Sequence, residues 1–328
     1  MRYVDAMKII FLGSGAFGLP ALKSIIACGL DVALVVTQPD KPAGRGRHST
    51  PTPIADYAST LGLNVLKTAN INQPEVSAAI QALTPEIMVI IAFGQKISDS
   101  VLRLAPHGGI NLHASLLPAF RGAAPIQRAI LSGDHTTGVS IIRVSRVMDG
   151  GEILAQTPTL IGESETAGEL HDRLAELGAP LIKQVIQQLA AGSLRAVVQD
   201  STRISQAPKL FKDMAWVDFS QSARLVSCRI RGLSPWPGCM ADVLTPDGVN
   251  RVKVSLLKCR EISHTGMAAE PGLVLPELHI ACGQGAIELL AIQPVGKRIM
   301  DMRSFANGYG IKPQWCLQSR QPAPEDRF

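Results

Sequence analysis

The chain has 328 residues, of which 46% are hydrophobic and 18% charged, and its formal net charge is +5. This length predicts two domains, and this composition excludes a disordered chain. The apolar runs, such as 87–92, are too short to cross a bilayer, and residues 1–6 lack the apolar core of a signal peptide. We therefore expect a cytoplasmic protein without a membrane partner.

The cysteines and the charge distribution narrow the classes further. None of the six cysteines stands in a C-x-x-C motif, so we expect buried free thiols, with neither a disulfide nor a metal site. Most of the excess positive charge falls in residues 209–328. This distribution favours a polyanionic partner for that part of the chain.

A glycine-rich turn follows the first predicted strand. The apolar run 8–12 precedes Gly13–Gly18, which matches G-x-G-x-x-G before a predicted helix at 19–28, a context typical of dinucleotide binding. A nicotinamide enzyme would also place an acid at the end of the second strand, 31–36, where this chain has Thr37. Two interpretations stay open: an NAD-dependent dehydrogenase, or glycines that permit a tight turn and close packing. We favour close packing.

Residues 38–53 are the most irregular segment, with four prolines, and the basic loop 38–50 within it contains Lys41, Arg45 and Arg47. We expect the loop to stay outside helices and strand ladders, because long loops of this composition are usually functional or mobile. It is either a solvated linker or a contact for a phosphate backbone, which its glycines would allow to approach closely.

Between residues 54 and 112, short apolar runs alternate with helical patterns. We predict helices at 54–61 and 74–83, and strands at 64–66, 86–92 and 109–112. Such alternation, with strands that are apolar almost throughout, is typical of an α/β protein with a Rossmann-like, doubly wound, mostly parallel sheet.

Polar side chains gather at the end of the last of these strands. Asn111 and His113 are two residues apart, so a strand turns them to the same face. Asp149 stands on a glycine-flanked turn, Met148–Glu152, between two further predicted strands. An Asn amide suits a developing oxyanion, His relays protons, and a carboxylate orients the imidazole. The three together indicate acyl transfer.

Ser115 is the alternative nucleophile, which would give a Ser-His-Asp hydrolase. The G-x-S-x-G pattern of such enzymes is absent around it. The residues that follow, Leu116, Leu117 and Pro118, are typical of a turn or a ligand wall. The segment 115–118 is therefore either a turn or the wall of a ligand site.

The second half of the chain begins with a long helix and ends in short strands. A capping-box pattern at Thr166–Glu169 starts the helix, and we expect Gly178 and Pro180 to kink or split it. About five short alternating runs between 240 and 292 predict a small β-barrel. We place the domain boundary in a linker, with domains at 1–206 and 207–328.

Several of these segments together resemble the methionyl-tRNA formyltransferase family, one of the folate-dependent formyltransferases. The Asn-x-His-x-Ser-Leu-Leu-Pro core is shared by folate-dependent formyltransferases in general, whereas the basic loop and the Arg-Gly-Ala-Ala-Pro-Ile-Gln run are specific to the tRNA enzymes. The matching segments are Gln38–Gly46, Asn111–Pro118, Arg121–Gln127, Ala207–Leu210 and Pro235–Pro237.

The resemblance implies a formyl donor and an acceptor. The donor is 10-formyltetrahydrofolate, and the acceptor is the α-amino group of methionine on initiator tRNA, in translation initiation. The C-terminal domain is expected to be an oligonucleotide/oligosaccharide-binding-like (OB-like) barrel that contacts tRNA, and neither NAD nor a metal takes part. The resemblance assigns catalysis to Asn111, His113 and Asp149, folate binding to Ser115, Leu116, Leu117 and Pro118, and tRNA binding to Lys41, Arg45 and Arg47.

The chain departs from the family pattern at two positions. Gly150 stands where the family usually has Thr, so Asp149 could be held less rigidly, and Phe120 replaces a usual Trp or Tyr. Besides the dehydrogenase, we keep as alternatives a formyltransferase of amino sugar nucleotides, which has no use for the basic loop, and a non-catalytic RNA-binding protein. We expect a monomer.

Overall fold

In the structure, a computed structural model, residues 7–43, 48–262 and 269–319 are described. The chain packs as two compact units. The first, called here the N-terminal unit, is made of 1–121, 138–158 and 171–206, and the C-terminal unit of 122–137, 159–170 and 207–328. Two segments that precede residue 206 thus pack with the C-terminal part, and the single domain boundary after residue 206 stays a prediction.

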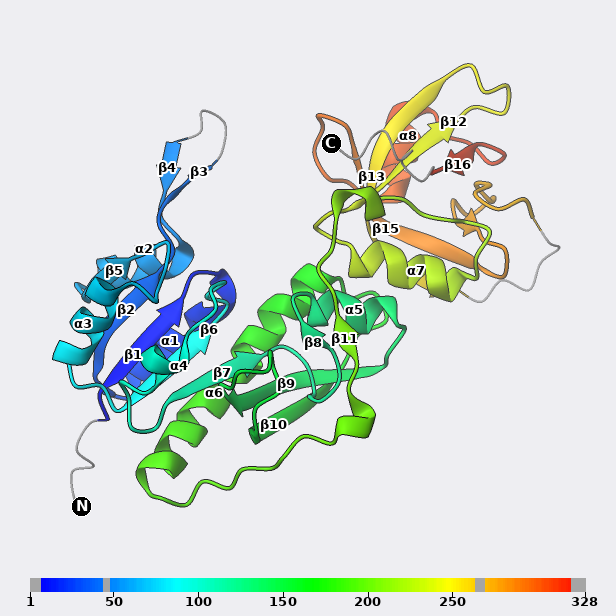
Figure 1. Cartoon of the computed structure of the whole chain (residues 1–328). Coiled ribbons are helices and arrows are strands. Elements are labelled where there is room, and N and C mark those ends of the chain that lie inside the picture. The colour runs from blue at the N-terminus through cyan, green and yellow to red at the C-terminus, as the bar shows by residue number, and fades with distance from the viewer. Residues whose placement is uncertain (1–6, 44–47, 263–268, 320–328) are drawn as a thin grey trace. The chain divides into compact units, whose positions relative to one another are not determined.

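The N-terminal unit is built on a seven-stranded sheet with strand order β10-β9-β7-β6-β1-β2-β5. The strands β1, β2, β5, β6 and β7 run parallel, whereas β9 is antiparallel to β7. The predicted Rossmann-like, mostly parallel sheet is confirmed (Figure 1). The bounds are β1 (Ile9–Gly13), β2 (Val32–Thr37), β5 (Val65–Lys67), β6 (Ile87–Ile91), β7 (Gly109–His113), β9 (Thr136–Arg143) and β10 (Ile153–Leu160).

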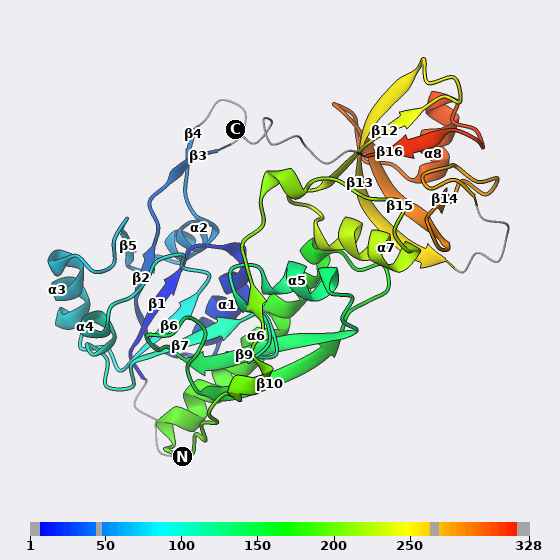
Figure 2. The ribbon, with the colours of Figure 1, turned by 45° about the vertical axis from the view of Figure 1, so that its right-hand side comes forward.

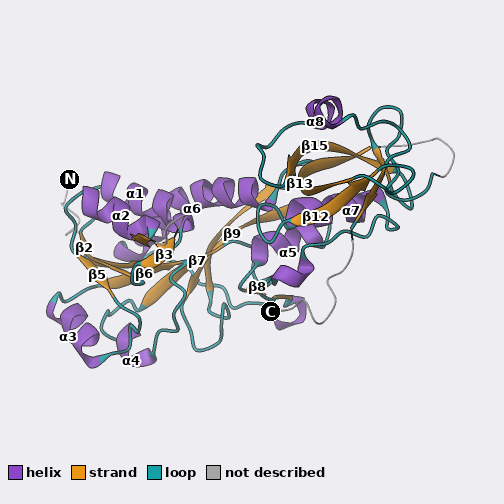
Figure 3. Ribbon diagram, turned by 90° about the horizontal axis from the view of Figure 1, so that it is seen from above, coloured by secondary structure: helices purple, strands orange, loops and turns teal. Residues whose placement is uncertain are grey.

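Helices cover both faces of this sheet, as the apolar strands require. Helices α1, α2 and α6 lie on one side and α3 and α4 on the other (Figure 3). Proline stands in the first turn of α2, α3 and α5, where its missing N–H costs nothing. The bounds of these helices are α1 (Leu19–Ala27), α2 (Pro53–Thr60), α3 (Pro74–Ala82), α4 (Asp99–Leu102) and α6 (Ala167–Ala190), whereas α5 (Pro125–Leu131) belongs to the C-terminal unit.

The glycines after β1 lie in tight packing. A Cβ at Gly13 would come within 2.7 Å of Phe11 and 3.1 Å of the Ile91 carbonyl, and one at Gly15 within 3.3 Å of the Ala92 Cβ. The pattern is thus accounted for by close packing of the turn on β6. The strand β2 ends at Thr37, whose hydroxyl lies 2.6 Å from that of Thr52.

Helix α6 runs unbroken from Ala167 to Ala190, so of the two outcomes expected at Gly178 and Pro180, a kink or a split, the split does not occur. A Cβ at Gly178 would lie 2.6 Å from Leu112 Cδ2. The glycine therefore serves the close approach of the helix to β7, and packing outweighs its low helix propensity. The predicted capping box forms, since Glu169 accepts from the Thr166 amide at 2.9 Å and the Thr166 hydroxyl accepts from the Glu169 amide at 3.3 Å.

The basic loop also departs from its prediction. Instead of staying outside any ladder, it forms a two-stranded antiparallel ribbon of β3 (Lys41–Ala43) and β4 (His48–Thr50). Pro42 is tolerated because both strands of this ribbon are edge strands. A proline has no N–H to donate, so it fits a strand position that has no neighbour on that side. The ribbon extends away from the carboxyl end of β2 (Figures 1 and 2).

The C-terminal unit contains a five-stranded antiparallel sheet with strand order β14-β15-β13-β12-β16. Leu273 pairs with Cys316 of β16 and Val274 with Ile280 of β14, so the two edges are nearly joined. This confirms the predicted small barrel. Its elements are α7 (Ala223–Gly232), β12 (Cys239–Leu244), β13 (Arg251–Ile262), β14 (Ile280–Ala281), β15 (Ala286–Pro294), α8 (Met302–Tyr309) and β16 (Cys316–Gln318). The remaining short elements are β8 (Arg121–Gly122), β11 (Gln206–Ala207) and 3-10 turns at Ala16–Gly18, Ser201–Arg203 and Lys212–Met214.

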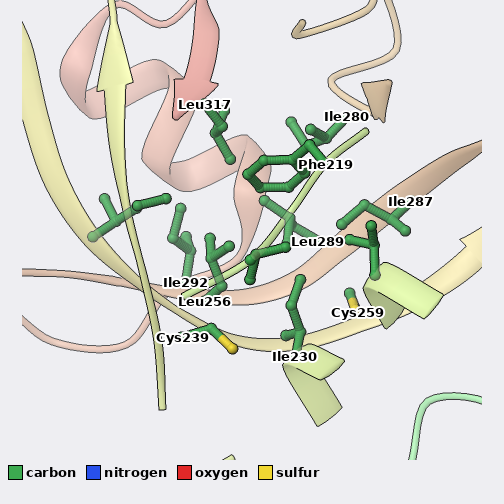
Figure 4. Packing of buried hydrophobic residues seen from close by; sticks show 14 of the residues in the cluster. Phe219, Ile230, Cys239, Leu256, Cys259, Ile280, Ile287, Leu289, Ile292 and Leu317 are labelled. Atoms are coloured by element: carbon green, nitrogen blue, oxygen red, sulfur yellow. The ribbon is translucent and has the colours of Figure 1, made fainter. Parts of the chain in front are cut away.

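The barrel interior is apolar and holds several thiols. Phe219, Ile230, Leu256 and Leu289 are among the side chains that fill it (Figure 4). All six cysteines are free; Cys28 is exposed and Cys316 partly exposed, contrary to the expectation of burial, and the other four are buried. None of the helices in the described part of the chain has the length and apolar character that a membrane span requires.

Candidate functional site

The strand β7 carries the first two candidate residues to the carboxyl edge of the parallel strands. It lies between β6 and β9, and Asn111 pairs with Ile90 on one side and Ile142 on the other. His113 is the last residue of the strand. Because alternate residues of a strand share a face, Asn111 and His113 point to the same side of the sheet, as predicted.

His113 is held at both ring nitrogens. Its Nε2 lies 2.9 Å from the carbonyl oxygen of Phe120, and because a carbonyl only accepts, this nitrogen carries a proton. Its Nδ1 lies 3.6 Å from Asp149 Oδ1. The side chains of His113 and Asp149 are only 7% and 14% exposed, so little water screens the interaction between them. The sequence predicted the pair but not the Phe120 carbonyl, which leaves no trace in a side-chain motif.

Asp149 sits on a turn between β9 and β10, at a φ of 51°. This left-handed backbone conformation is rare outside glycine, although Asp tolerates it better than most residues. We call Val147–Gly151 the Asp149 turn. Asn111 is half-buried, and its side-chain amide has no hydrogen-bonding partner among the residues described. It therefore offers a donor beside the His113–Asp149 pair.

The segment 115–118 is held by polar contacts, of which those to Ser140 are buried. The Ser140 hydroxyl donates to the Ser115 carbonyl at 2.6 Å and accepts from the Leu117 amide at 3.0 Å. Gln156 Nε2 donates to the Leu117 carbonyl at 2.8 Å. The Leu117–Pro118 bond is cis. Ser140 and Gln156 are positioning residues that sequence reasoning missed, because their role depends on cross-strand neighbours.

The position of Ser115 argues against a Ser-His-Asp hydrolase. Its side chain is fully buried, and its hydroxyl donates to the Ala119 carbonyl at 2.6 Å. The imidazole of His113 is engaged with Phe120 and Asp149 instead. A serine nucleophile needs its hydroxyl within hydrogen-bonding reach of the base and of the substrate. This arrangement provides neither.

The base of the β3–β4 ribbon is fixed to the same sheet edge. Gln38 accepts from Lys41 Nζ at 2.9 Å and donates to the Phe93 carbonyl, just beyond β6, at 2.9 Å. Asp40 is ion-paired with Lys67 of β5 at 2.7 Å. Lys41, at the start of the ribbon, is exposed. Arg45 and Arg47, the other predicted tRNA contacts, lie outside the described residues.

Comparison with known proteins identifies both parts of the chain. The model of the formyl transferase family matches residues 7–186, and that of the formyl transferase C-terminal domain matches residues 209–310. The methionyl-tRNA formyltransferase of Methylococcus capsulatus is 38% identical over 308 residues, covering 93% of this chain and 98% of its own. That of Roseobacter denitrificans is 40% identical over 307 residues, covering 93% and 97%.

Solved structures agree in fold. A sugar 3N-formyl transferase, WlaRD, crystallised with dTDP and 5-N-formyl-THF, has a TM-score of 0.61 at 16% identity and covers 89% of this chain and 99% of its own. HypX from Aquifex aeolicus, in complex with tetrahydrofolic acid, has a TM-score of 0.62 at 14% identity and covers 94% of this chain and 48% of its own. At such identities the likeness concerns the fold alone. On the family models and the full-length relatives, this chain belongs to the formyltransferase family and, within it, to the methionyl-tRNA formyltransferases.

Proposed function

We propose that this protein transfers the formyl group of 10-formyltetrahydrofolate to the α-amino group of methionine on initiator tRNA, in the cytoplasm, at the start of translation. The observation that carries the proposal is the largely buried His113–Asp149 pair, with the Asn111 side chain on the same strand face. Relatives named methionyl-tRNA formyltransferase, 38–40% identical over nearly their whole length, support the choice of acceptor.

In the proposed reaction the neutral methionyl amine attacks the formyl carbon directly. A carbon–nitrogen bond forms, and the formyl oxygen becomes an oxyanion that accepts hydrogen bonds from Asn111 and His113. The proton on Nε2 of His113, which the Phe120 carbonyl holds in the free enzyme, is available for this purpose. The oxyanion competes with that carbonyl for the proton.

Asp149 completes the reaction through His113. Its carboxylate orients the ring at Nδ1. It also assists removal of the proton from the attacking nitrogen. The bond from the formyl carbon to folate N10 then breaks, and N10 takes up a proton as tetrahydrofolate departs. No covalent intermediate with the protein is needed.

The folate and the tRNA are assigned to separate surfaces. We infer that Ser115, Leu116, Leu117 and Pro118 form a wall for the folate, because hydrogen bonds to Ser140 and Gln156 keep this segment in place. Lys41, Arg45 and Arg47 are proposed to contact tRNA phosphates, and the C-terminal barrel a further part of the tRNA.

A direct assay tests the proposal. The full chain is incubated with 10-formyltetrahydrofolate and methionyl initiator tRNA, and formyl-methionine is measured after hydrolysis of the ester. A non-initiator methionyl-tRNA and a dTDP-linked amino sugar serve as competing acceptors. We expect formylation of the initiator tRNA in preference to both. Preferential formylation of the amino sugar, or of no acceptor, would contradict the proposal.

A further inference from the structure

Gln199 belongs to no motif, yet it spans the Asp149 turn. Its side chain is buried, with 9% exposure. Its Nε2 donates to the backbone carbonyls of Asp149 and Gly151, each at 2.7 Å. Its Oε1 accepts from Nε and Nη2 of Arg121, at 3.1 and 2.7 Å. A carboxamide has two N–H donors and two lone pairs on oxygen, so every hydrogen-bonding position of Gln199 is used. We call these two side chains the Gln199–Arg121 clamp.

The backbone of the Asp149 turn is unusual, so contacts from outside the turn help to fix its conformation. Asp149 is in the left-handed region, and two glycines follow it. A Cβ at Gly151 would overlap the Arg143 carbonyl oxygen, so no side chain fits there. Within the turn, the Gly150 amide donates to the Val147 carbonyl at 3.0 Å. Consecutive glycines have many accessible conformations, and the two bonds from the clamp restrict them.

The clamp is tied to the segment that also holds His113. The Phe120 carbonyl meets the imidazole, and Arg121, the next residue, holds the clamp. Both backbone amides are anchored on Ser205: Phe120 donates to its hydroxyl and Arg121 to its carbonyl, each at 2.9 Å. Two consecutive residues thus connect to both members of the candidate pair.

We propose that Gln199, held by Arg121, is a positioning residue that keeps the Asp149 carboxylate beside His113 during formyl transfer. The inference rests on the proposed function of that pair. It also answers how the turn stays ordered with Gly150 in place of the usual Thr. Without the two N–H donors the turn reaches other conformations, and the carboxylate leaves its place at Nδ1.

Kinetics of Gln199→Met test the proposal, since methionine keeps the length of the side chain and removes both donors. We expect kcat to fall about 10- to 100-fold, the usual cost of a small misplacement of a reacting group. The KM values for folate and tRNA stay within about twofold, because binding groups are untouched. The matched control is Gln95→Met, which removes a 2.8 Å donation to the Thr68 carbonyl in the N-terminal unit and leaves kcat unchanged.

A double-mutant cycle with Asp149→Asn separates positioning from a merely structural role. If Gln199 acts through Asp149, Gln199→Met costs much less in the Asp149→Asn background than in the wild type. An equal loss in both backgrounds would overturn the proposal. Gln199→Glu keeps an acceptor for Arg121 but removes both donors, and we expect it to lose as much kcat as Gln199→Met. Wild-type kcat in Gln199→Glu would also overturn it.

Hydrogen exchange of the full chain gives a readout independent of activity. In Gln199→Met we expect faster exchange of backbone amides in 147–151, with the rest of the sheet unchanged; unaltered exchange there contradicts the proposal. If that variant does not fold, Arg121→Lys, which removes the forked donor, is expected to show the same changes at smaller size. If the wild type fails to formylate methionyl-tRNA, the proposed function is wrong. If Asp149→Asn is impaired and Gln199→Met is not, only the clamp is wrong.

Discussion

At the scale of single residues, the backbone does as much as the side chains in fixing His113. One ring nitrogen meets a carbonyl of the chain and the other a carboxylate on a neighbouring turn. Asn111, His113 and Asp149 were predictable because their types and spacing carry a chemical meaning. The Phe120 carbonyl and Gln199 were not, because a carbonyl is common to every residue and Gln199 lies 50 residues from its partner Asp149.

Ser115 offers a test that separates acyl transfer to an amine from a serine hydrolase. Its hydroxyl donates to the Ala119 carbonyl within the proposed folate wall. We therefore expect Ser115→Ala to raise the KM for 10-formyltetrahydrofolate while kcat stays within about tenfold, as for loss of a binding interaction. Steady-state kinetics measure both. A loss of kcat by several orders of magnitude, with folate affinity unchanged, would instead support Ser115 as a catalytic nucleophile.

At the scale of elements, the basic ribbon shows how composition misled the prediction. Prolines and glycines indicated a loop outside any ladder, but a ladder of three residue pairs forms around Pro42. Prolines and glycines are unfavourable in the central strands of a sheet. In a two-stranded ribbon both strands are edge strands, where a proline is allowed. The role of Lys41, Arg45 and Arg47 as tRNA contacts stays a prediction.

Arg45→Ala tests that role. Because phosphate contacts release counterions, we expect the KM for tRNA to rise and the salt dependence of tRNA binding to weaken by about one phosphate contact. Binding is measured at several salt concentrations. Arg103→Ala, an exposed arginine after α4, is the matched control and should leave both quantities unchanged. If the salt dependence of tRNA binding were unaltered in Arg45→Ala, the basic segment would be a linker and not a tRNA contact.

Helix α6 gives a second test at this scale. A side chain at position 178 would press on Leu112 of β7, at 2.6 and 2.8 Å from its two methyl carbons. We expect Gly178→Ala to lower the free energy of unfolding by about 1–3 kcal/mol, the usual cost of overpacking. Denaturant unfolding measures it. Gly308→Ala, in α8 with nothing within 4 Å of its Cβ, should instead raise stability slightly. Similar effects in both variants would contradict the packing argument.

At the scale of the whole molecule, the general fold was predictable and the packing of its segments was not. Alternating helices and apolar strands indicated the parallel sheet, and short alternating runs the barrel. Residues 122–137 and 159–170 nevertheless pack with the C-terminal unit. Such an exchange depends on which apolar faces meet in space, which periodicity along the chain does not record.

Because of the buried thiols in the barrel, the free energy of unfolding is expected to fall as the pH rises in the alkaline range. Burial raises the pKa of Cys239, Cys259 and Cys282 to about 12, from an ordinary value of 9.0. The unfolded chain therefore loses these protons first. Their contribution to stability is complete below pH 9 and is lost as the pH rises towards 12. A variant with all three replaced by Ala should show a shallower fall of the unfolding midpoint across this range. Equal slopes would show that other groups cause the fall.

The most direct test of the account compares single-turnover formylation of methionyl initiator tRNA by the wild type, Asn111→Ala and His113→Ala. If these side chains stabilise the oxyanion, each variant binds 10-formyltetrahydrofolate as the wild type does but transfers its formyl group about 10²–10³-fold more slowly. Folate affinity is measured on the same preparations by fluorescence titration. Formyl transfer at nearly the wild-type rate in either variant would contradict the role assigned to the end of β7.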